Sequence, residues 1–112
     1  EKIIIKGSDK RFRDFIYIED VVDAIILSLK DNSKFNIFNI CTGKKTTVKE
    51  IIIKLLKIFK YKNYPIKVIG GTPRDQFGVF GSNLRAKKIL KWQPKYDIED
   101  GLKLTLNKHI ND

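Results

Sequence analysis

The sequence predicts an α/β fold on the basis of three patterns. Short apolar runs bounded by turn residues predict strands, and longer segments with apolar residues three and four apart predict helices; the two kinds of segment alternate along the 112 residues. Residues 35–41 are apolar on both faces, which is typical of a strand covered on both sides in a parallel sheet. A capping box opens the second predicted helix.

The first part of the chain predicts two strands and a helix. Residues 2–6 favour a short strand, residues 7–9 a turn, and residues 11–18 a second extended run. From Ile18 to residues 31–33 the spacing becomes helical, because one face collects Val21, Val22, Ile25, Ile26 and Leu29.

The middle of the chain predicts strand, helix and strand. Thr42-Gly43 ends the third strand at residues 35–41. Thr47 and Glu50 can satisfy each other's backbone amides, which predicts a helix N-terminus. Its apolar face would carry Val48, Ile51, Ile52, Leu55, Leu56 and Phe59. Residues 65–69 predict a fourth short strand.

Two more helices are predicted after an irregular stretch at residues 70–78. Ser82 or Asn83 is expected to cap a helix that ends before Trp92-Gln93-Pro94. Asp97 is expected to cap the last helix, with apolar residues at Ile98, Leu102, Leu106 and Ile110.

The composition limits the partners and the location. The net charge of +10 favours anionic partners, which are nucleic acid, a membrane surface or phosphorylated small molecules, although drift toward A·T-rich codons would also enrich lysine. No apolar run is long enough to span a bilayer, so we expect a cytoplasmic protein. The chain lacks methionine and begins inside a predicted strand, so we expect it to be a segment of something longer.

The sequence lacks the residues that several kinds of chemistry require. His109, the one histidine, falls in the last helical turn, and the one cysteine, Cys41, follows a buried-looking strand without a histidine neighbour. No Cys, His and carboxylate cluster has zinc or calcium spacing. Neither a G-x-G-x-x-G fingerprint nor a phosphate-binding loop with its lysine occurs. We therefore assign no catalytic, cofactor-binding or metal residue to this chain.

Two places could bind an anion. Arg13 precedes a predicted strand-to-helix turn, where it could meet an anion, although it could also be a surface arginine paired with Asp14 or Asp20. The second place is the glycine-rich stretch at residues 70–78, where Arg74, Asp75 and Gln76 set a cation, an acceptor and an amide side by side.

An ordered set of residues resembles the carboxy-terminal third of the extended short-chain dehydrogenase/reductase family, which includes NAD-dependent nucleotide-sugar epimerases and dehydratases. The set covers nearly all of the chain: Gly7, Arg13 to Val22, Phe38-Asn39-Ile40, Thr42-Gly43, Asp75, Ala86, Leu90, Trp92, Pro94 and Gly101-Leu102. The resemblance implies that residues 1–112 are the carboxy-terminal substrate-binding lobe of a Rossmann-type protein. It also implies that the strand at residues 35–41 belongs to the nucleotide-binding sheet.

The resemblance implies roles for single residues. Arg13 would hold the diphosphate of a UDP-sugar-like nucleotide sugar, and Asp75 would approach the ribose. The family's second diphosphate-binding arginine falls on Thr72, and its following glycine on Arg74, so we expect Arg74 to replace that arginine in part. Lys91 stands where the family has a glycine before Trp92. NAD would bind the full-length parent, whereas this chain alone would bind none and would be inactive.

Two other classes stay open. One is a basic nucleic-acid-binding module, and the other is a structural or dimerisation fragment without a ligand. Against the first, the lysines are scattered over the polar faces of at least three helices and no nucleic-acid motif occurs. We expect no specific nucleic-acid partner and no membrane partner, and we expect self-association through an unpaired strand edge.

Overall fold

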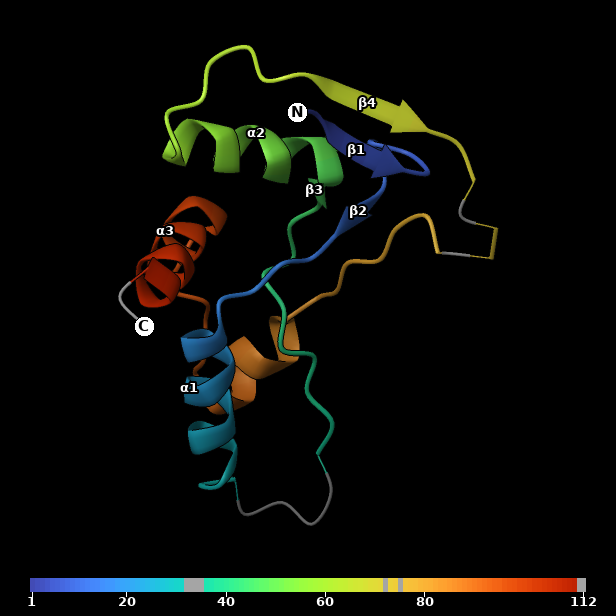
Figure 1. Cartoon of the computed structure of the whole chain (residues 1–112). Coiled ribbons are helices and arrows are strands. Elements are labelled where there is room, and N and C mark those ends of the chain that lie inside the picture. Colours follow the sequence, from blue (N-terminus) through green and yellow to red (C-terminus); the bar gives the residue numbers. More distant parts are fainter. Residues whose placement is uncertain (32–35, 72, 75, 111–112) are drawn as a thin grey trace. The chain divides into compact units, whose positions relative to one another are not determined.

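The computed structural model describes residues 1–31, 36–71, 73–74 and 76–110, except for the side chains of residues 109 and 110. The chain forms two compact units, which we call unit 1 (residues 1–13 and 45–79) and unit 2 (residues 14–44 and 80–112) (Figure 1). Predictions that concern Phe35, Thr72 or Asp75 lie outside the described residues.

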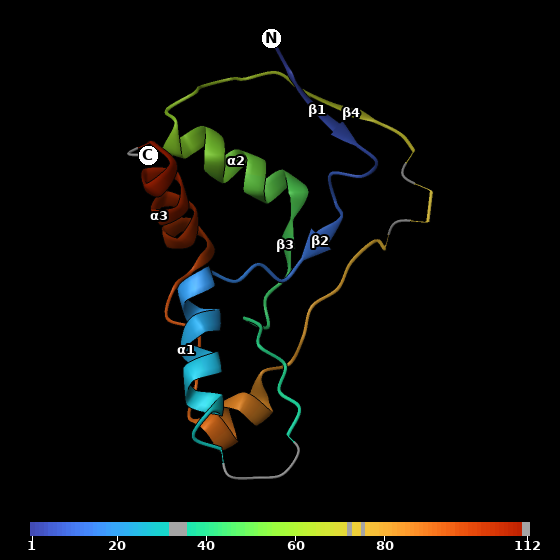
Figure 2. The same cartoon turned by 60° about the horizontal axis from the view of Figure 1, so that its bottom comes forward.

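Unit 1 contains four short strands in two pairs (Figure 2). β1 (Ile3–Lys6) pairs in parallel with β4 (Ile66–Ile69), and these are the strands predicted at residues 2–6 and 65–69. β2 (Phe12–Arg13) pairs antiparallel with β3 (Thr46–Thr47). β2 is much shorter than the extended run predicted at residues 11–18: only Phe12 and Arg13 pair with β3, and α1 already begins at Ile18.

The helix of unit 1, α2 (Val48–Ile58), begins at the predicted capping box. The Glu50 amide donates to the Thr47 hydroxyl at 3.1 Å, and the Thr47 amide donates to the Glu50 carboxylate at 2.6 Å. These two bonds satisfy amides that have no partner within the helix. The predicted start of this helix is confirmed.

The core of unit 2 forms around Trp92. Its helices are α1 (Ile18–Ser28), the π-helix η1 (Ala86–Leu90) and α3 (Ile98–Ile110). The cluster of buried apolar residues comprises Ala24, Ala86, Leu90 and Trp92. The Asp100 amide donates to the Asp97 carboxylate at 2.9 Å, which confirms the cap predicted for the last helix.

The apolar face predicted for α1 is not its buried face. Five of its residues are exposed: Ile18, Val22, Ile25, Ile26 and Leu29. The buried residues of the helix are Asp20 and Ala24, one turn apart, with Ala24 in the Trp92 cluster. The Trp92 cluster and the backbone amides that Asp20 binds therefore decide which face is covered, and the most apolar face is left open.

The strand predicted at residues 35–41 is also wrong over its described part. Residues 36–41 adopt no strand, and no ladder partner for them exists among the residues that the structure describes. A strand is defined by bonds to a neighbour, so an apolar run alone cannot form one. Its place in a nucleotide-binding sheet stays a prediction.

The helix predicted after Ser82 or Asn83 begins with two α-helical residues, 84 and 85, and continues as η1. The Asn83 side-chain amide donates to the Cys41 carbonyl at 2.8 Å, which ties the segment to the chain before Gly43 instead of capping a helix. At the other end Lys91 has a φ of 56°, the left-handed conformation that glycine adopts most easily. Among the helices of the described residues, none has the length and apolar character needed to cross a bilayer.

Lys91→Gly is expected to stabilise the chain by about 0.5–1 kcal/mol, because glycine adopts a positive φ without the steric penalty of a Cβ. Lys88→Gly, which removes the same charge inside η1, should instead destabilise it by a similar amount, roughly 0.5–1 kcal/mol. Urea unfolding followed by circular dichroism measures both. If both variants shift the unfolding midpoint in the same direction, the conformational explanation is wrong.

Candidate functional site

Arg13 lies at the end of β2, and its guanidinium holds backbone carbonyls of the irregular stretch of unit 1. Nη2 donates to the Gln76 carbonyl at 2.9 Å, and Nη1 to those of Phe12 at 2.8 Å and Phe77 at 3.5 Å. Neither interpretation of Arg13 from sequence predicted these contacts. They fix the plane of a side chain that otherwise has many rotamers.

Residues 76–78, which include the two carbonyls of this stretch that Arg13 binds, pack closely against Phe12. The Phe12 amide donates to the Phe77 carbonyl at 3.2 Å, and the two rings pack edge to face with centroids 6.1 Å apart. A Cβ on Gly78 would lie 2.2 Å from the Phe12 ring, so only glycine fits there. Lys45 lies over the same ring, with Nζ 5.1 Å from the centroid. The ring and the glycine together bring two carbonyls to Arg13.

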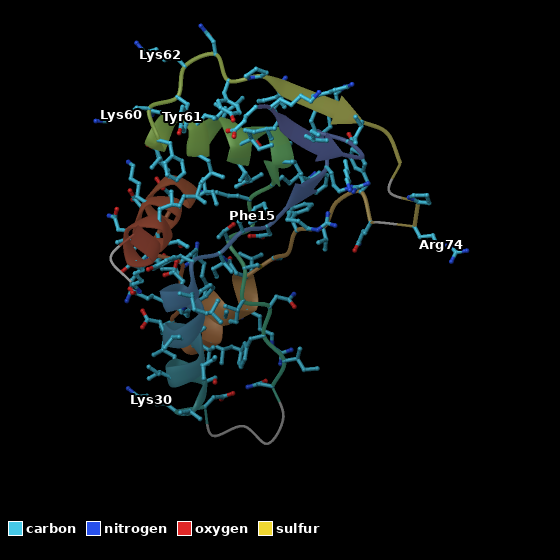
Figure 3. All side chains as sticks on the ribbon, viewed as in Figure 1. Phe15, Lys30, Lys60, Tyr61, Lys62 and Arg74 are labelled. Atoms are coloured by element: carbon cyan, nitrogen blue, oxygen red, sulfur yellow. The ribbon has the colours of Figure 1, made fainter. Side chains whose placement is uncertain are left out.

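Arg74 is exposed, and Figure 3 shows its side chain directed away from the ribbon. Its φ of 68° is again a conformation that favours glycine, which agrees with its place at the glycine of the family's motif. The structure thus presents Arg74 at the surface and not among the groups that hold Arg13. Asp75, the third predicted site residue, lies outside the described residues.

Asp14 organises the turn that follows residues 36–41, a role that sequence reasoning missed. Its carboxylate accepts from the amides of Thr42 at 2.8 Å, Gly43 at 2.8 Å and Gly81 at 3.4 Å, and also from the Thr42 hydroxyl. Gly81 also allows a close approach, because a Cβ there would lie 2.7 Å from the Cys41 sulfur. One carboxylate therefore joins Asp14-Phe15 to the Thr-Gly motif within unit 2. The occurrence of both motifs in the sequence was the signal from which this role of Asp14 could have been predicted.

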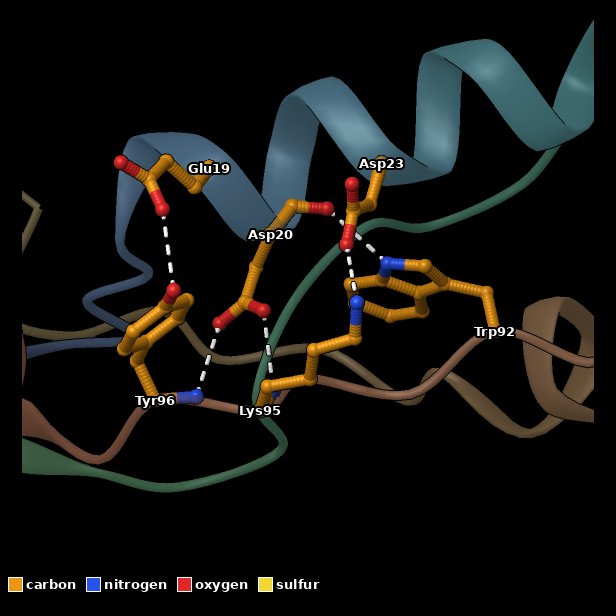
Figure 4. Close-up of polar contacts among 6 residues, drawn as sticks. All are labelled: Glu19, Asp20, Asp23, Trp92, Lys95 and Tyr96. Carbon is orange, nitrogen blue, oxygen red and sulfur yellow. Dashed lines mark hydrogen bonds and ion pairs between the residues drawn. The ribbon is translucent and has the colours of Figure 1, made fainter.

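Asp20 is fully buried and is the second structural carboxylate of unit 2 (Figure 4). It accepts from the amides of Lys95 at 2.8 Å and Tyr96 at 3.2 Å, while its backbone carbonyl accepts from the Trp92 indole at 2.9 Å. A buried carboxylate requires such partners, because burial without them is costly. The contacts of Asp20 thus link the acid of the first motif to Trp92 of the last.

The ionisable groups around this cluster are exposed. A hydrogen bond from Tyr96 lowers the pKa of Glu19, as does one from Lys108, and the pKa of Tyr96 rises for the same reason. The ion pair with Asp23 raises the pKa of Lys95. Exposed pairs of this kind contribute little to stability and carry no catalytic arrangement.

The predicted places of the two residues excluded from catalysis are confirmed in part: Cys41 is buried but follows no strand, and His109 lies in the last turn of a helix. Cys41 is buried, and burial, followed by the charge of Asp14, raises the pKa of its thiol. The thiol therefore stays protonated near neutral pH and is a poor nucleophile. His109 lies in the last turn of α3. Among the described residues, no group of three or more His, Cys, Asp or Glu could hold a metal ion.

These features define a class of protein. Arg13 ends a strand of an α/β unit, Asp14 anchors the Thr-Gly turn, and Asp20 binds the buried Trp92. This order is that of the carboxy-terminal part of extended short-chain dehydrogenases/reductases. A family model for GDP-mannose 4,6 dehydratase matches residues 1–105. The chain therefore belongs to the extended short-chain dehydrogenase/reductase family of nucleotide-sugar epimerases and dehydratases.

Individual relatives agree with this assignment. The chain is 33% identical to a UDP-glucuronate 4-epimerase of Thermodesulfobacterium geofontis, over 94% of this chain and 32% of that protein. It is 36% identical to a putative UDP-glucose 4-epimerase of Methanocaldococcus jannaschii, over 93% of this chain and 33% of that protein. The crystal structure of Thermotoga maritima UDP-glucose 4-epimerase with UDP-glucose has a TM-score of 0.88 and 32% identity, covering 99% of this chain and 35% of that one. The chain thus spans about a third of the length of these relatives.

Proposed function

We propose that this chain is the part of an NAD-dependent nucleotide-sugar epimerase or dehydratase that binds the nucleotide diphosphate. The observation that carries the proposal is the Arg13 guanidinium, held at the end of β2 by the carbonyls of Gln76 and Phe77. A solved relative of 32% identity contains UDP-glucose, which supports a nucleotide sugar as the ligand class.

Arg13 would favour diphosphate binding because its guanidinium is already oriented before the ligand binds. A guanidinium offers a planar fork that can donate two hydrogen bonds to a diphosphate, and the carbonyl contacts already orient its plane. Binding a remote phosphate holds the sugar in place while the reaction proceeds elsewhere. The groups of this chain that take part are therefore binding groups.

Two further residues belong to the same proposal. Asp75 matches the acid of the family's loop motif and would approach the ribose. Arg74 would supply part of the charge of the second diphosphate-binding arginine, whose position here is Thr72. The exposure of Arg74 leaves its side chain accessible to a ligand, and Pro73 restricts the backbone before it.

NAD would bind the portion of a longer protein that this chain does not contain. Solved relatives contain NAD, among them the Thermus thermophilus UDP-glucose 4-epimerase. NAD would supply reversible hydride transfer at the sugar, and we expect the chain alone to bind no NAD and to be inactive. The exposed face of α1 and residues 36–41 would pack against that portion, where residues 36–41 would gain strand partners. Without it, these surfaces favour self-association.

The test is a titration of uridine diphosphate against single alanine variants of the complete protein. Losing one charged hydrogen-bonding partner should weaken binding by about 1.5–3 kcal/mol, or roughly ten- to a hundredfold, for Arg13→Ala. Arg74→Ala should give a smaller loss in the same direction. Arg85→Ala, which removes an exposed arginine of unit 2, is the control and should bind normally.

Different results separate the parts of this proposal. If Arg13→Ala binds like the unmodified protein, the diphosphate-binding role is wrong. If Arg13→Ala loses binding and Arg74→Ala does not, the substitution of the second arginine is wrong and Arg13 keeps its role.

A further inference from the structure

Phe77 carries an exposed aromatic ring beside the candidate site. The residue is 54% exposed, although the segment that contains it packs closely against Phe12. Exposed apolar side chains are common at protein surfaces, so exposure alone assigns no role to this ring. Phe77 also lies outside the set of residues that match the family's motifs, so the resemblance assigns it no role either. The position of Phe77 relative to Arg13 is what points to a function.

The main chain of Phe77 is in direct contact with the Arg13 guanidinium. The Phe77 carbonyl accepts from Arg13 Nη1 at 3.5 Å and from the Phe12 amide at 3.2 Å. The preceding carbonyl, that of Gln76, accepts from Arg13 Nη2 at 2.9 Å. The exposed ring is therefore carried by a residue that the guanidinium itself binds, and both residues belong to unit 1.

Contacts other than the Phe77 ring already hold this segment in place. The Phe12 ring lies against Gly78, and the backbone bonds of Phe77 and Gln76 fix the main chain. The rings of Phe12 and Phe77 meet edge to face, with their planes at 86°. A contact of this kind covers at most one face of either ring. At least one face of the Phe77 ring is thus not covered by Phe12, and more than half of the residue reaches solvent.

A nucleoside diphosphate bound by Arg13 would bring its nucleoside close to this ring. In such a ligand only the ribose separates the base from the diphosphate. Asp75, which would approach the ribose, precedes Phe77 by two residues in the chain. With the diphosphate on the guanidinium and the ribose near Asp75, the nucleoside lies on the side of the ligand where Phe77 stands. Every base has a π face that stacks favourably on an aromatic side chain.

We propose that the Phe77 ring is a stacking surface for the nucleoside of the bound nucleotide. This inference rests on the proposed function, because it takes the diphosphate to lie on Arg13. The two residues then bind different parts of the ligand. Arg13 binds the charge that every diphosphate has, whereas Phe77 adds affinity only for ligands that contain a nucleoside. Because stacking tolerates any base, Phe77 raises the affinity for nucleotides without selecting among the bases.

The test compares uridine diphosphate with inorganic pyrophosphate as ligands of the complete protein, by isothermal titration calorimetry. Phe77→Leu should bind uridine diphosphate about fivefold more weakly, or weaker still, and should bind pyrophosphate as the unmodified protein does. Phe77→Tyr keeps an aromatic ring and should bind both ligands normally. The matched control is Phe59→Leu, which removes another exposed phenylalanine of unit 1 and should also bind both ligands normally.

The pattern of losses separates this inference from the proposed function. If Phe77→Leu weakens both ligands equally, the ring acts only by holding Arg13 in place, and the stacking role is wrong. The stacking role is also wrong if Phe77→Leu binds uridine diphosphate normally, even where it binds UDP-glucose more weakly, since the ring would then contact the sugar. If Arg13→Ala binds both ligands normally while Phe77→Leu loses affinity for uridine diphosphate alone, the diphosphate role of Arg13 is wrong and the stacking role stands.

Discussion

Replacing Trp92 with alanine is expected to destabilise unit 2 by about 3–5 kcal/mol, the range for removing a large aromatic residue from a core. The indole is 2% exposed, packs with Ala24, Ala86 and Leu90, and donates to the Asp20 carbonyl at 2.9 Å. Loss of the ring leaves a cavity and removes the indole donor from the Asp20 carbonyl. Urea unfolding followed by circular dichroism at 222 nm, the usual helix band, measures the change.

Trp92→Phe separates packing from the hydrogen bond. Phenylalanine keeps most of the apolar volume but leaves the Asp20 carbonyl without the indole donor, so the expected loss is smaller, about 1–2 kcal/mol. Equal losses in the two variants would show that the hydrogen bond, and not the packing, stabilises this core. A loss below about 1 kcal/mol in Trp92→Ala would contradict the placement of Trp92 at the centre of unit 2.

The parts of the fold that could be predicted are set by interactions between residues that are close in sequence. The capping pair Thr47 and Glu50 and the Asp97 cap need only a three-residue spacing, so the residues alone define them. The short strands at residues 2–6 and 65–69 were also recognisable from composition, although their parallel pairing was not. Local signals therefore identified where elements begin, but not what they contact.

The buried face of α1 could not be predicted in this way. Apolar spacing favoured the face of Val22, Ile25 and Ile26, which the structure leaves exposed. Asp20 is buried because two amides more than 70 residues away, at Lys95 and Tyr96, donate to it. Such partners are invisible to any local pattern, and burying a carboxylate contradicts the average preference of that residue type.

The candidate site was partly predictable through the family's motifs. The resemblance pointed to Arg13 and showed that Arg74 and Lys91 stand at glycine positions, and both residues have the positive φ that glycine favours. It could not reveal that the carbonyls of Gln76 and Phe77 hold the Arg13 guanidinium, since backbone acceptors leave no mark on residue identity. The diphosphate role of Arg13 stays a prediction until a ligand titration tests it.

Asp14→Ala is expected to destabilise unit 2 by about 2–4 kcal/mol, because it removes the acceptor for the amides of Thr42, Gly43 and Gly81 at once. Hydrogen bonds to a charged group contribute more than neutral ones, but three that share a carboxylate do not add fully. The turn at Thr42-Gly43 would have to find water for its amides, so local opening should accompany the loss. Hydrogen exchange at the Thr42 and Gly43 amides measures that opening directly.

Asp14→Asn is the matched variant, since it keeps the size of the side chain and one acceptor oxygen while replacing the other with a donor. Its amide nitrogen would face a backbone N–H, either that of Thr42 or that of Gly43, so we expect about half the loss of the alanine variant. Thr42→Val, which removes the hydroxyl that donates to Asp14 and accepts from the Lys44 amide at 3.1 Å, should cost about 1 kcal/mol. If Asp14→Ala unfolds at the same urea concentration as the unmodified chain, the carboxylate does not hold the turn, and the two motifs occur together for another reason.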